Sequence, residues 1–290
     1  MHVAGRGRVH LMPRALDGKV AVITGASSGI GAACAIEMAR AGMDIALVAR
    51  RADRLERMAA QVRAIGRRAT VIVADVAQPG HERELLDAAQ RDLGRVDVVF
   101  ANAGYGQDRA VIEMDETELR AMFETNFFSS VSLLRESARR MIDRRQAGHL
   151  LMCSSVVAKF AMPRMGAYSA SKAAQAMVCR AMRTELEPHG IAVSSVHPVT
   201  TRTEFFQESA RRSGREAAEQ VPAHAPKLFV QPPERVARAV VACLRRPCAE
   251  VWTSHLVRLS AALFTAFPGL LDPVLRRTHA ADLGDPSRGA

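Results

Sequence analysis

Short apolar runs alternate with helical patterns along most of the chain, and this alternation limits the possible folds more than any other feature. The runs are mostly apolar and, in the first hundred residues, rich in β-branched residues, which is typical of strands buried on both faces. They lie at 20–24, 44–49, 69–74, 96–101, 148–154, 191–197 and 250–256. Strands that alternate with helices form a parallel sheet covered on both sides. We therefore predict an α/β fold: a single Rossmann-like, doubly wound domain with about seven parallel strands.

A length of 290 residues without an internal repeat or a linker indicates one large domain. We expect a flexible N-terminal tail over 1–16 and a catalytic domain over 17–255, with a substrate lid at 200–226. An apolar helical extension is expected over 256–290. No uncharged apolar run reaches the roughly 18 residues that suggest a membrane span. Either Met1 or Met12 fits as the start of the protein.

The formal charge of +10 comes mostly from arginines scattered over predicted helix faces. We interpret it as a compositional bias rather than a surface for nucleic acid, because no recognition motif accompanies it. The five cysteines have no spacing typical of a zinc or redox site, so no metal is expected. Free thiols and the lack of a secretory signal favour a reducing, cytoplasmic location.

A glycine cluster follows the first predicted strand directly and opens the first helix, over residues 24–31. In such a turn, backbone N–H groups and the helix N-terminus can approach a pyrophosphate that a Cβ would keep away. The cluster alone is weak evidence, but its place between strand and helix indicates dinucleotide binding rather than a plain tight turn. The contacts are expected from Gly25, Ser27, Ser28, Gly29, Ile30 and Gly31.

The end of the second strand indicates which dinucleotide is bound. An acidic residue there would bind the ribose 2′-hydroxyl of NAD, but this chain has Arg50 and Arg51. Two guanidinium groups suit a 2′-phosphate. We therefore predict that NADP(H) is preferred over NAD(H). The alternative is that these arginines merely begin an arginine-rich helix.

Two further strand ends carry candidate cofactor contacts. Asp75 and Val76 follow the third strand, where a carboxylate can accept a hydrogen bond from the adenine amino group. Asn102, Ala103 and Gly104 follow the fourth strand, and their small side chains would let the backbone approach the ribose. Each motif is common by itself, so their position after successive strands is the informative point.

Tyr168 and Lys172 provide the strongest chemical signal. Residues four apart share one helix face, so phenol and ammonium lie side by side, which lowers a tyrosine pKa from about 10. Such a phenol can exchange a proton with a substrate oxygen. Ser155, at the end of the fifth strand, can polarise that oxygen, although Ser154 competes for this role. Asn126, on an apolar helix, either supports a proton relay to Lys172 or is a satisfied core amide.

Together these motifs resemble the short-chain dehydrogenase/reductase family over roughly 17–256. The family's glycine motif, its Asn-Ala-Gly and its Asn-Ser-Tyr-Lys tetrad are matched in order. The tetrad would be Asn126, Ser155, Tyr168 and Lys172. The resemblance implies that Tyr168 is the general acid–base, that Lys172 also holds the nicotinamide ribose, and that the protein is a homodimer or homotetramer.

One segment departs from the family pattern. Pro198, Thr201 and Thr203 are expected to contact the cofactor, and the resemblance implies that Thr203 holds the nicotinamide carboxamide. Val199 stands where the family usually has glycine, so the geometry of that turn is in question. In the lid that follows, Phe205 and Phe206 either line an apolar pocket or anchor a helix.

The C-terminal stretch 256–271 is unusually apolar and predicts a helix interrupted at Pro268. It suits packing on the domain or on a second subunit, peripheral membrane contact through 256–277, or a cover for the substrate pocket. The predicted activity is NADPH-dependent hydride transfer with a small carbonyl or alcohol, and a lipophilic one is among the interpretations. The alternative is a dinucleotide-sensing regulatory protein with weak catalysis; the sequence names no substrate.

Overall fold

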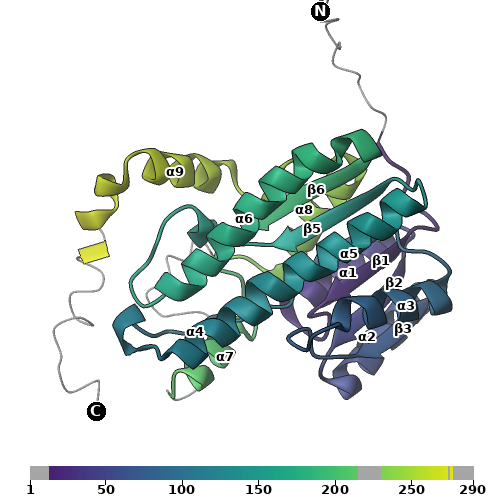
Figure 1. Ribbon diagram of the computed structural model, residues 1–290, viewed down its shortest axis with the longest axis horizontal. Helices are drawn as coiled ribbons and strands as arrows, with labels where there is room; N and C mark the ends of the chain where they lie inside the picture. Colours follow the sequence, from purple (N-terminus) through teal and green to yellow (C-terminus); the bar gives the residue numbers. More distant parts are fainter. Residues whose placement is uncertain (1–12, 215–229, 274, 277–290) are drawn as a thin grey trace, which may run out of the picture.

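The computed structural model describes residues 13–214, 230–273 and 275–276. Within them, one sheet has the strand order β3-β2-β1-β4-β5-β6-β7, and every neighbouring pair is parallel (Figure 1). The strands are β1 (Val20–Thr24), β2 (Asp44–Ala49), β3 (Ala69–Val73), β4 (Val98–Ala101), β5 (Gly148–Cys153), β6 (Ile191–His197) and β7 (Glu250–Trp252). The predicted parallel α/β fold is confirmed.

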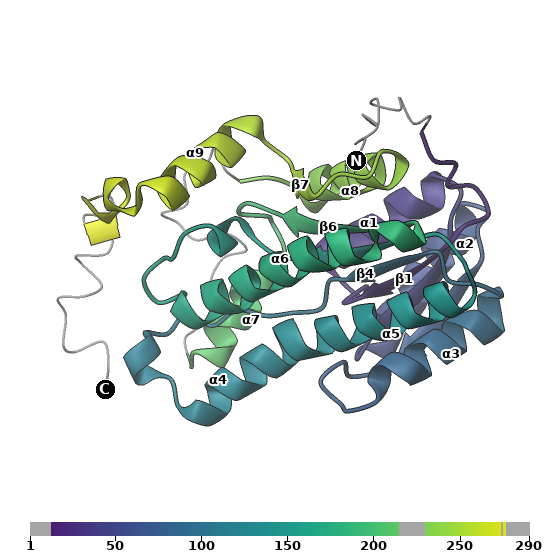
Figure 2. The ribbon, with the colours of Figure 1, turned by 45° about the horizontal axis from the view of Figure 1, so that its top comes forward.

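Helices cover both faces of this sheet (Figures 1 and 2). One face carries α1 (Gly29–Arg40), α2 (Ala52–Ala64) and α8 (Pro233–Arg245). The other carries α3 (His81–Leu93), α5 (Ser129–Asp143) and α6 (Gly166–Leu186). Alternate residues of a strand enter the two cores: Ala21 and Ile23 pack on the first face, and Val20 and Val22 on the second. This two-sided burial explains why the strands are continuously apolar in sequence.

Shorter elements connect the layers. The helix α4 (Glu116–Phe123) runs into α5 through a π-helical turn at Glu124–Phe128. Single 3-10 turns lie at Val111–Glu113, Val156–Ala158, Glu187–His189 and Pro268–Leu270. The first part of the predicted lid forms α7 (Phe205–Arg212), and a bridge joins Thr201 to Gln231. Residues 215–226 of that lid lie outside the described residues.

Both ends of the described chain differ in detail from the expectation. Leu16, placed in the predicted tail, is buried in the core, and the Arg14 backbone N–H donates to the Arg245 carbonyl at 2.8 Å. The last strand was expected to reach residue 256 but ends at Trp252. Ser254 begins the next helix, α9 (His255–Ala266), because its side chain caps the Val257 N–H. The rest of the tail (1–12) and of the extension (277–290) lies outside the described residues.

The strand order reverses between β1 and its neighbours β2 and β4. In doubly wound sheets, ligands bind at the carboxyl ends of the strands beside such a switch point. The glycine cluster, both arginines and Asn102 all follow the carboxyl ends of these three strands. Among the described residues, no helix is long and apolar enough to cross a bilayer.

Candidate active site

The glycine turn after β1 is too tight for side chains. Gly25 and Gly29 have φ angles of +67° and +57°, in the left-handed region that favours glycine. A Cβ on Gly31 would collide with the Gly25 carbonyl and lie 2.7 Å from the Asn102 amide nitrogen. The turn therefore leaves a cradle at the N-terminus of α1, and this shape fits a dinucleotide pyrophosphate.

Asn102 and Ala103 fasten this turn to the end of β4. Their backbone N–H groups donate to the Thr24 hydroxyl at 2.9 and 3.0 Å, and the Asn102 amide donates to the Thr24 carbonyl at 3.0 Å. Thr24 was not singled out from the sequence, although it directly precedes Gly25. Gly104 continues the chain toward Lys172, whose Nζ would be 3.3 Å from a Cβ at this position.

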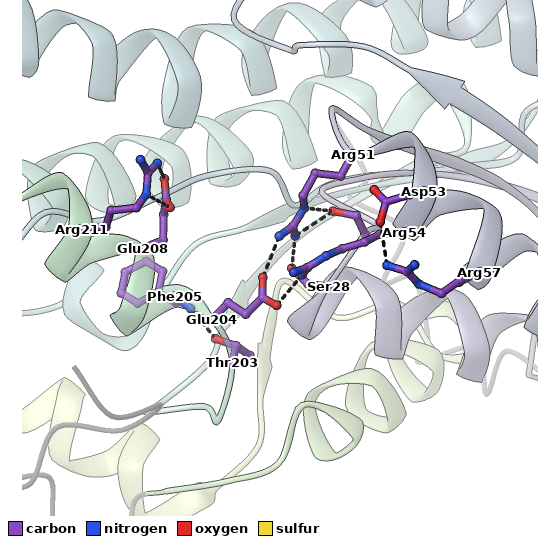
Figure 3. A network of polar contacts seen from close by, with 11 residues as sticks. Ser28, Arg51, Asp53, Arg54, Arg57, Thr203, Glu204, Phe205, Glu208 and Arg211 are labelled. Carbon is purple, nitrogen blue, oxygen red and sulfur yellow. Dashed lines mark hydrogen bonds and ion pairs between the residues drawn. The ribbon is translucent and has the colours of Figure 1, made fainter. Parts of the chain in front are cut away.

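The two arginines at the end of β2 point to different partners (Figure 3). The Arg51 guanidinium donates to the Ser27 hydroxyl at 3.0 Å and to the Ser28 hydroxyl at 2.8 Å, so it lies over the glycine turn. The Arg50 guanidinium is 3.8 Å from the Asp75 carboxylate, which also accepts from the Ala77 N–H. Val76, beside Asp75, is buried.

A carboxylate from the segment after β6 joins this cluster. Glu204, just before α7, accepts from Arg51 at 2.8 Å and forms a short ion pair with Arg54 (Figure 3). The structure thus brings Arg51 and Arg54 together, rather than Arg50 and Arg51. The sequence analysis missed both Glu204 and Arg54, because a contact across some 150 residues leaves no local pattern.

Tyr168, near the start of α6, is buried and hydrogen-bonded to Ser155 at the end of β5. The neighbouring Ser154 points elsewhere, because its hydroxyl donates to the Lys172 carbonyl at 2.8 Å. Ser155 is therefore the serine that the structure brings to the tyrosine. Tyr168, Ser155 and Lys172 form one cluster at the carboxyl end of β5.

Lys172 is almost completely buried, and its Nζ donates to the Cys153 carbonyl at 2.7 Å. The ammonium is 5.6 Å from the centre of the Tyr168 ring, as the helical spacing predicted. Burial lowers the pKa of Lys172 to about 8. Burial also raises the pKa of Tyr168, which outweighs the hydrogen bond from Ser155 that lowers it. This net direction is opposite to the acidic phenol expected from the sequence, since desolvation of both groups dominates.

Asn126 lies in the π-helical turn and is fully buried. Its side chain accepts from the Tyr105 N–H and donates to the Tyr105 carbonyl, both at 2.9 Å, and it donates to Ser171 at 3.0 Å. The amide thus clamps the backbone just after the Asn-Ala-Gly segment. Local π-turns often mark functional positions.

His197 supports the site and was missed in the sequence analysis. Its Nδ1 is 3.0 Å from the Ser155 carbonyl, its Nε2 is 2.9 Å from the Ser195 hydroxyl, and its ring stacks on Trp252. Burial lowers the pKa of His197 to about 4, so the ring is neutral near neutral pH. It fixes the backbone that carries Ser155.

The segment after β6 contains three residues that were expected to contact the cofactor, Pro198, Thr201 and Thr203, and each has different neighbours. The Pro198 carbonyl accepts from the Val156 N–H, and the buried Thr201 hydroxyl donates to the Val199 carbonyl at 2.7 Å. Thr203 faces the glycine turn, where its methyl group would be 3.0 Å from a Cβ on Gly29. Among the described residues, the non-glycine positions with positive φ are Arg145 and Arg164. Val199 therefore replaces the family's glycine without backbone strain.

An apolar cluster lies beside the tyrosine on the lid side. Phe205 of α7 packs with its ring centre 5.2 Å from that of Tyr168. Buried or partly buried apolar side chains continue the cluster: Tyr105, Met122, Val157, Met162, Met165 and Phe160. Among the described residues, no group of three His, Cys, Asp or Glu side chains could hold a metal ion.

Known proteins of similar sequence are dehydrogenases and reductases. A family model described as short chain dehydrogenase matches residues 19–214. The 1-deoxy-11-beta-hydroxypentalenate dehydrogenase of Streptomyces exfoliatus is 34% identical over 203 residues, which cover 69% of this chain and 71% of that protein. The glycine betaine reductase ATRR of Emericella nidulans is 34% identical over 239 residues. This chain spans only 18% of that protein's length, while the match covers 80% of this chain.

Solved structures show the same fold with nicotinamide cofactors. A short chain dehydrogenase/reductase from Burkholderia phymatum in complex with NAD has a TM-score of 0.78 at 25% identity, covering 89% of this chain and 96% of that one. A short-chain dehydrogenase from Sphingobium yanoikuyae in complex with NADPH has a TM-score of 0.72 at 28% identity, with 88% and 95% covered. The chain belongs to the short-chain dehydrogenase/reductase family of NAD(P)-dependent oxidoreductases.

Proposed function

We propose that this protein is an NADPH-dependent oxidoreductase that interconverts a carbonyl compound and its alcohol, with Tyr168 as the general acid–base. The observation that carries the proposal is the buried cluster of Tyr168, Ser155 and Lys172 next to a glycine cradle. The cradle suits a dinucleotide, and the cluster provides a proton donor where a substrate oxygen would lie.

Each residue of the cluster has a distinct task. The bound nicotinamide supplies the hydride in reduction and takes it in oxidation. Ser155 orients the substrate oxygen, and Tyr168 donates a proton to it or accepts one from it. Lys172, still largely protonated at neutral pH with a pKa of about 8, places positive charge beside the phenol. Asn126 keeps the backbone near Tyr105 in place.

The cofactor is held by the strand ends that the sequence singled out. The cradle of Gly25, Gly29 and Gly31 would receive the pyrophosphate, Asp75 and Val76 the adenine, and Asn102 to Gly104 the ribose. Thr203 and Lys172, together with Pro198 and Thr201, would hold the nicotinamide part. The preference for NADP(H) is supported by Arg51, which lies over the turn between Ser27 and Ser28.

The substrate side is apolar, and this favours a carbonyl or alcohol with a lipophilic body. Phe205 and the methionines near Tyr168 would contact that body. We further propose residues 17–255 as the catalytic domain, and a homodimer or homotetramer as the assembly, as is usual in the family. Five free cysteines support a cytoplasmic location.

The test is a panel of ketones, aldehydes and lipophilic alcohols, followed by nicotinamide absorbance with NADPH or NADP⁺ and, in parallel, NADH or NAD⁺. We expect turnover of at least one carbonyl or alcohol, with a higher kcat/KM for the phosphorylated cofactor. If the protein binds NADPH but turns over no member of the panel, it is a dinucleotide sensor rather than an enzyme. If NADH is used equally well, the cofactor assignment is wrong.

A further inference from the structure

Glu204 binds two arginines beside the glycine turn. It precedes the first residue of α7, yet its side chain does not cap that helix. The carboxylate instead reaches the Arg51 and Arg54 guanidinium groups, at the start of α2 (Figure 3). Although burial acts to raise it, the hydrogen bonds from these two arginines lower the pKa of Glu204. The group is therefore an anion held by two cations at neutral pH.

The cluster is not electrically balanced. Two guanidinium groups face one carboxylate, while the nearby Asp53 is paired with Arg57 at 2.8 Å on the other side of the helix turn. A phosphate monoester carries a charge of about −1.5 to −2 at neutral pH and accepts bidentate hydrogen bonds from arginine. It therefore matches the two arginines better than one carboxylate does.

The existing ion pairs are weak enough to be exchanged. The side chains of Arg51, Arg54 and Glu204 are 41%, 35% and 40% exposed. Ion pairs with such exposure contribute little to stability, because water and salt screen the two charges. A ligand phosphate can thus displace the carboxylate, while Ser27 and Ser28 keep Arg51 oriented toward the cradle.

We propose that Glu204 is an internal competitor for the 2′-phosphate of NADPH, and that Arg51 and Arg54 form the site for which both anions compete. The inference rests on the proposed function, because it assumes that a dinucleotide binds in the glycine cradle. Glu204 then determines cofactor specificity by lowering the affinity for the phosphorylated cofactor only. A dinucleotide without a 2′-phosphate does not need these two cations.

The same exchange links the cofactor to α7. Glu204 lies between Thr203, which packs on Gly29, and Phe205, which packs on Tyr168. Displacement of the carboxylate frees the start of α7 from α2. Binding of the phosphate and release of Glu204 are coupled, and such coupling is reciprocal. A change that releases this end of α7 therefore also strengthens binding of the phosphorylated ligand.

The test compares binding of adenosine 2′,5′-bisphosphate and of 5′-AMP by calorimetry in the wild type, Glu204→Gln and Glu208→Gln. Glu208 is the matched control, since it lies on α7 but pairs with Arg211 and Arg212. We expect Glu204→Gln to tighten the bisphosphate by roughly three- to tenfold and to leave 5′-AMP within about twofold. Glu208→Gln is expected to change neither.

Two kinds of result overturn the proposal. Weaker or unchanged bisphosphate binding in Glu204→Gln shows that the carboxylate does not compete. Equal tightening of both ligands, or the same gain in Glu208→Gln, indicates a general charge effect. A wild type that binds both ligands equally contradicts the NADP preference of the proposed function. In that case, a gain confined to the bisphosphate in Glu204→Gln still supports the competition.

Discussion

Tyr168 and Lys172 show how a buried pair differs from the same pair on an exposed helix. The spacing of four residues places the ammonium near the phenol, as expected. Both groups are buried, however, and burial disfavours the charged form of each: it raises the pKa of the tyrosine and lowers that of the lysine. The ligand-free protein therefore holds a neutral phenol, suited to donating a proton.

The neutral phenol can be measured directly, because the chain has only two tyrosines. Burial raises the pKa of Tyr105 as well as that of Tyr168. We expect the tyrosinate absorbance of the ligand-free protein at about pH 10, where free tyrosine is half ionised, to be well below half of its final value. A Tyr168→Phe variant shows how much of the absorbance change comes from each tyrosine. One full tyrosinate near pH 8 would contradict this description.

Residue roles could be predicted from the sequence where a strand end or helical spacing fixes the neighbours. Ser155, Tyr168 and Lys172 meet this condition, and so do Gly25, Gly29 and Gly31. His197, Arg54 and Glu204 do not, since each acts through a partner distant in sequence. The sequence also suggested Arg50 beside Arg51. The structure turns Arg50 toward Asp75, because adjacent residues at the start of a helix point in different directions.

At the scale of elements, buried strands were the most predictable. Six of the seven expected runs lie within two residues of the observed strand ends, because continuous apolar sequence is required for burial on both faces. The length of the last strand was overestimated. Hydrophobicity alone does not show where the strand stops and the cap of the following helix begins. A helix in the lid was one of two alternatives for Phe205 and Phe206, and the structure forms it as α7; its mostly polar sequence gave no bounds for it.

Within the part of the chain that the structure describes, the helix α9 leaves an apolar face uncovered. It packs on the domain through Val257 and Ala261, through Phe264 against Phe160, and through Thr265, which donates to the Lys159 carbonyl. The views place it at the periphery of the molecule (Figures 1 and 2). Its outer side exposes Leu256, Leu259, Leu263, Phe267 and, in the following turn, Leu270. Peripheral membrane contact, one of the roles that the sequence left open for this segment, would need such a face.

Replacing Leu259 and Leu263 together by glutamate tests that contact. We expect the double variant to lose co-sedimentation with anionic phospholipid vesicles, while turnover of a water-soluble carbonyl stays within about twofold, because burial of apolar area drives such binding. Ile112→Glu is the control, since Ile112 is 95% exposed on a different part of the surface. Equal sedimentation of the wild type and the double variant would show that this face does not bind membranes. A change of size in solution would show that the face joins two subunits.

At the scale of the whole molecule, many of the described arginines form ion pairs with acidic residues. Arginines pair with acidic residues on the same helix, such as Arg140 with Glu136, or across elements, such as Arg68 with Asp44. At the carboxyl end of β6, beside the edge strand β7, buried polar groups without charge bind one another instead. His197 is the clearest case, buried and neutral between Ser155, Ser195 and Trp252.

This histidine makes global stability depend on pH. Its folded-state pKa of about 4 lies below the usual 6.5, so the unfolded chain binds the proton first. The free energy of unfolding is therefore fully maintained above about pH 6.5 and decreases as the pH falls toward 4, by about 2 to 3 kcal/mol from this group. Denaturant titrations between pH 6.5 and 4.5 of the wild type and His197→Asn measure the effect. If the free energy of unfolding depends on pH equally in both proteins, groups other than His197 cause the effect.

In the proposed reaction, the Tyr168 phenol exchanges a proton with the substrate oxygen during hydride transfer. The most direct measurement is the turnover rate of Tyr168→Phe with NADPH and a carbonyl substrate, beside the dissociation constant of NADPH. We predict a loss of at least about 100-fold in kcat with NADPH affinity nearly unchanged, because the substitution removes one hydroxyl from an otherwise intact site. A variant that turns over at the rate of the wild type would contradict the claim.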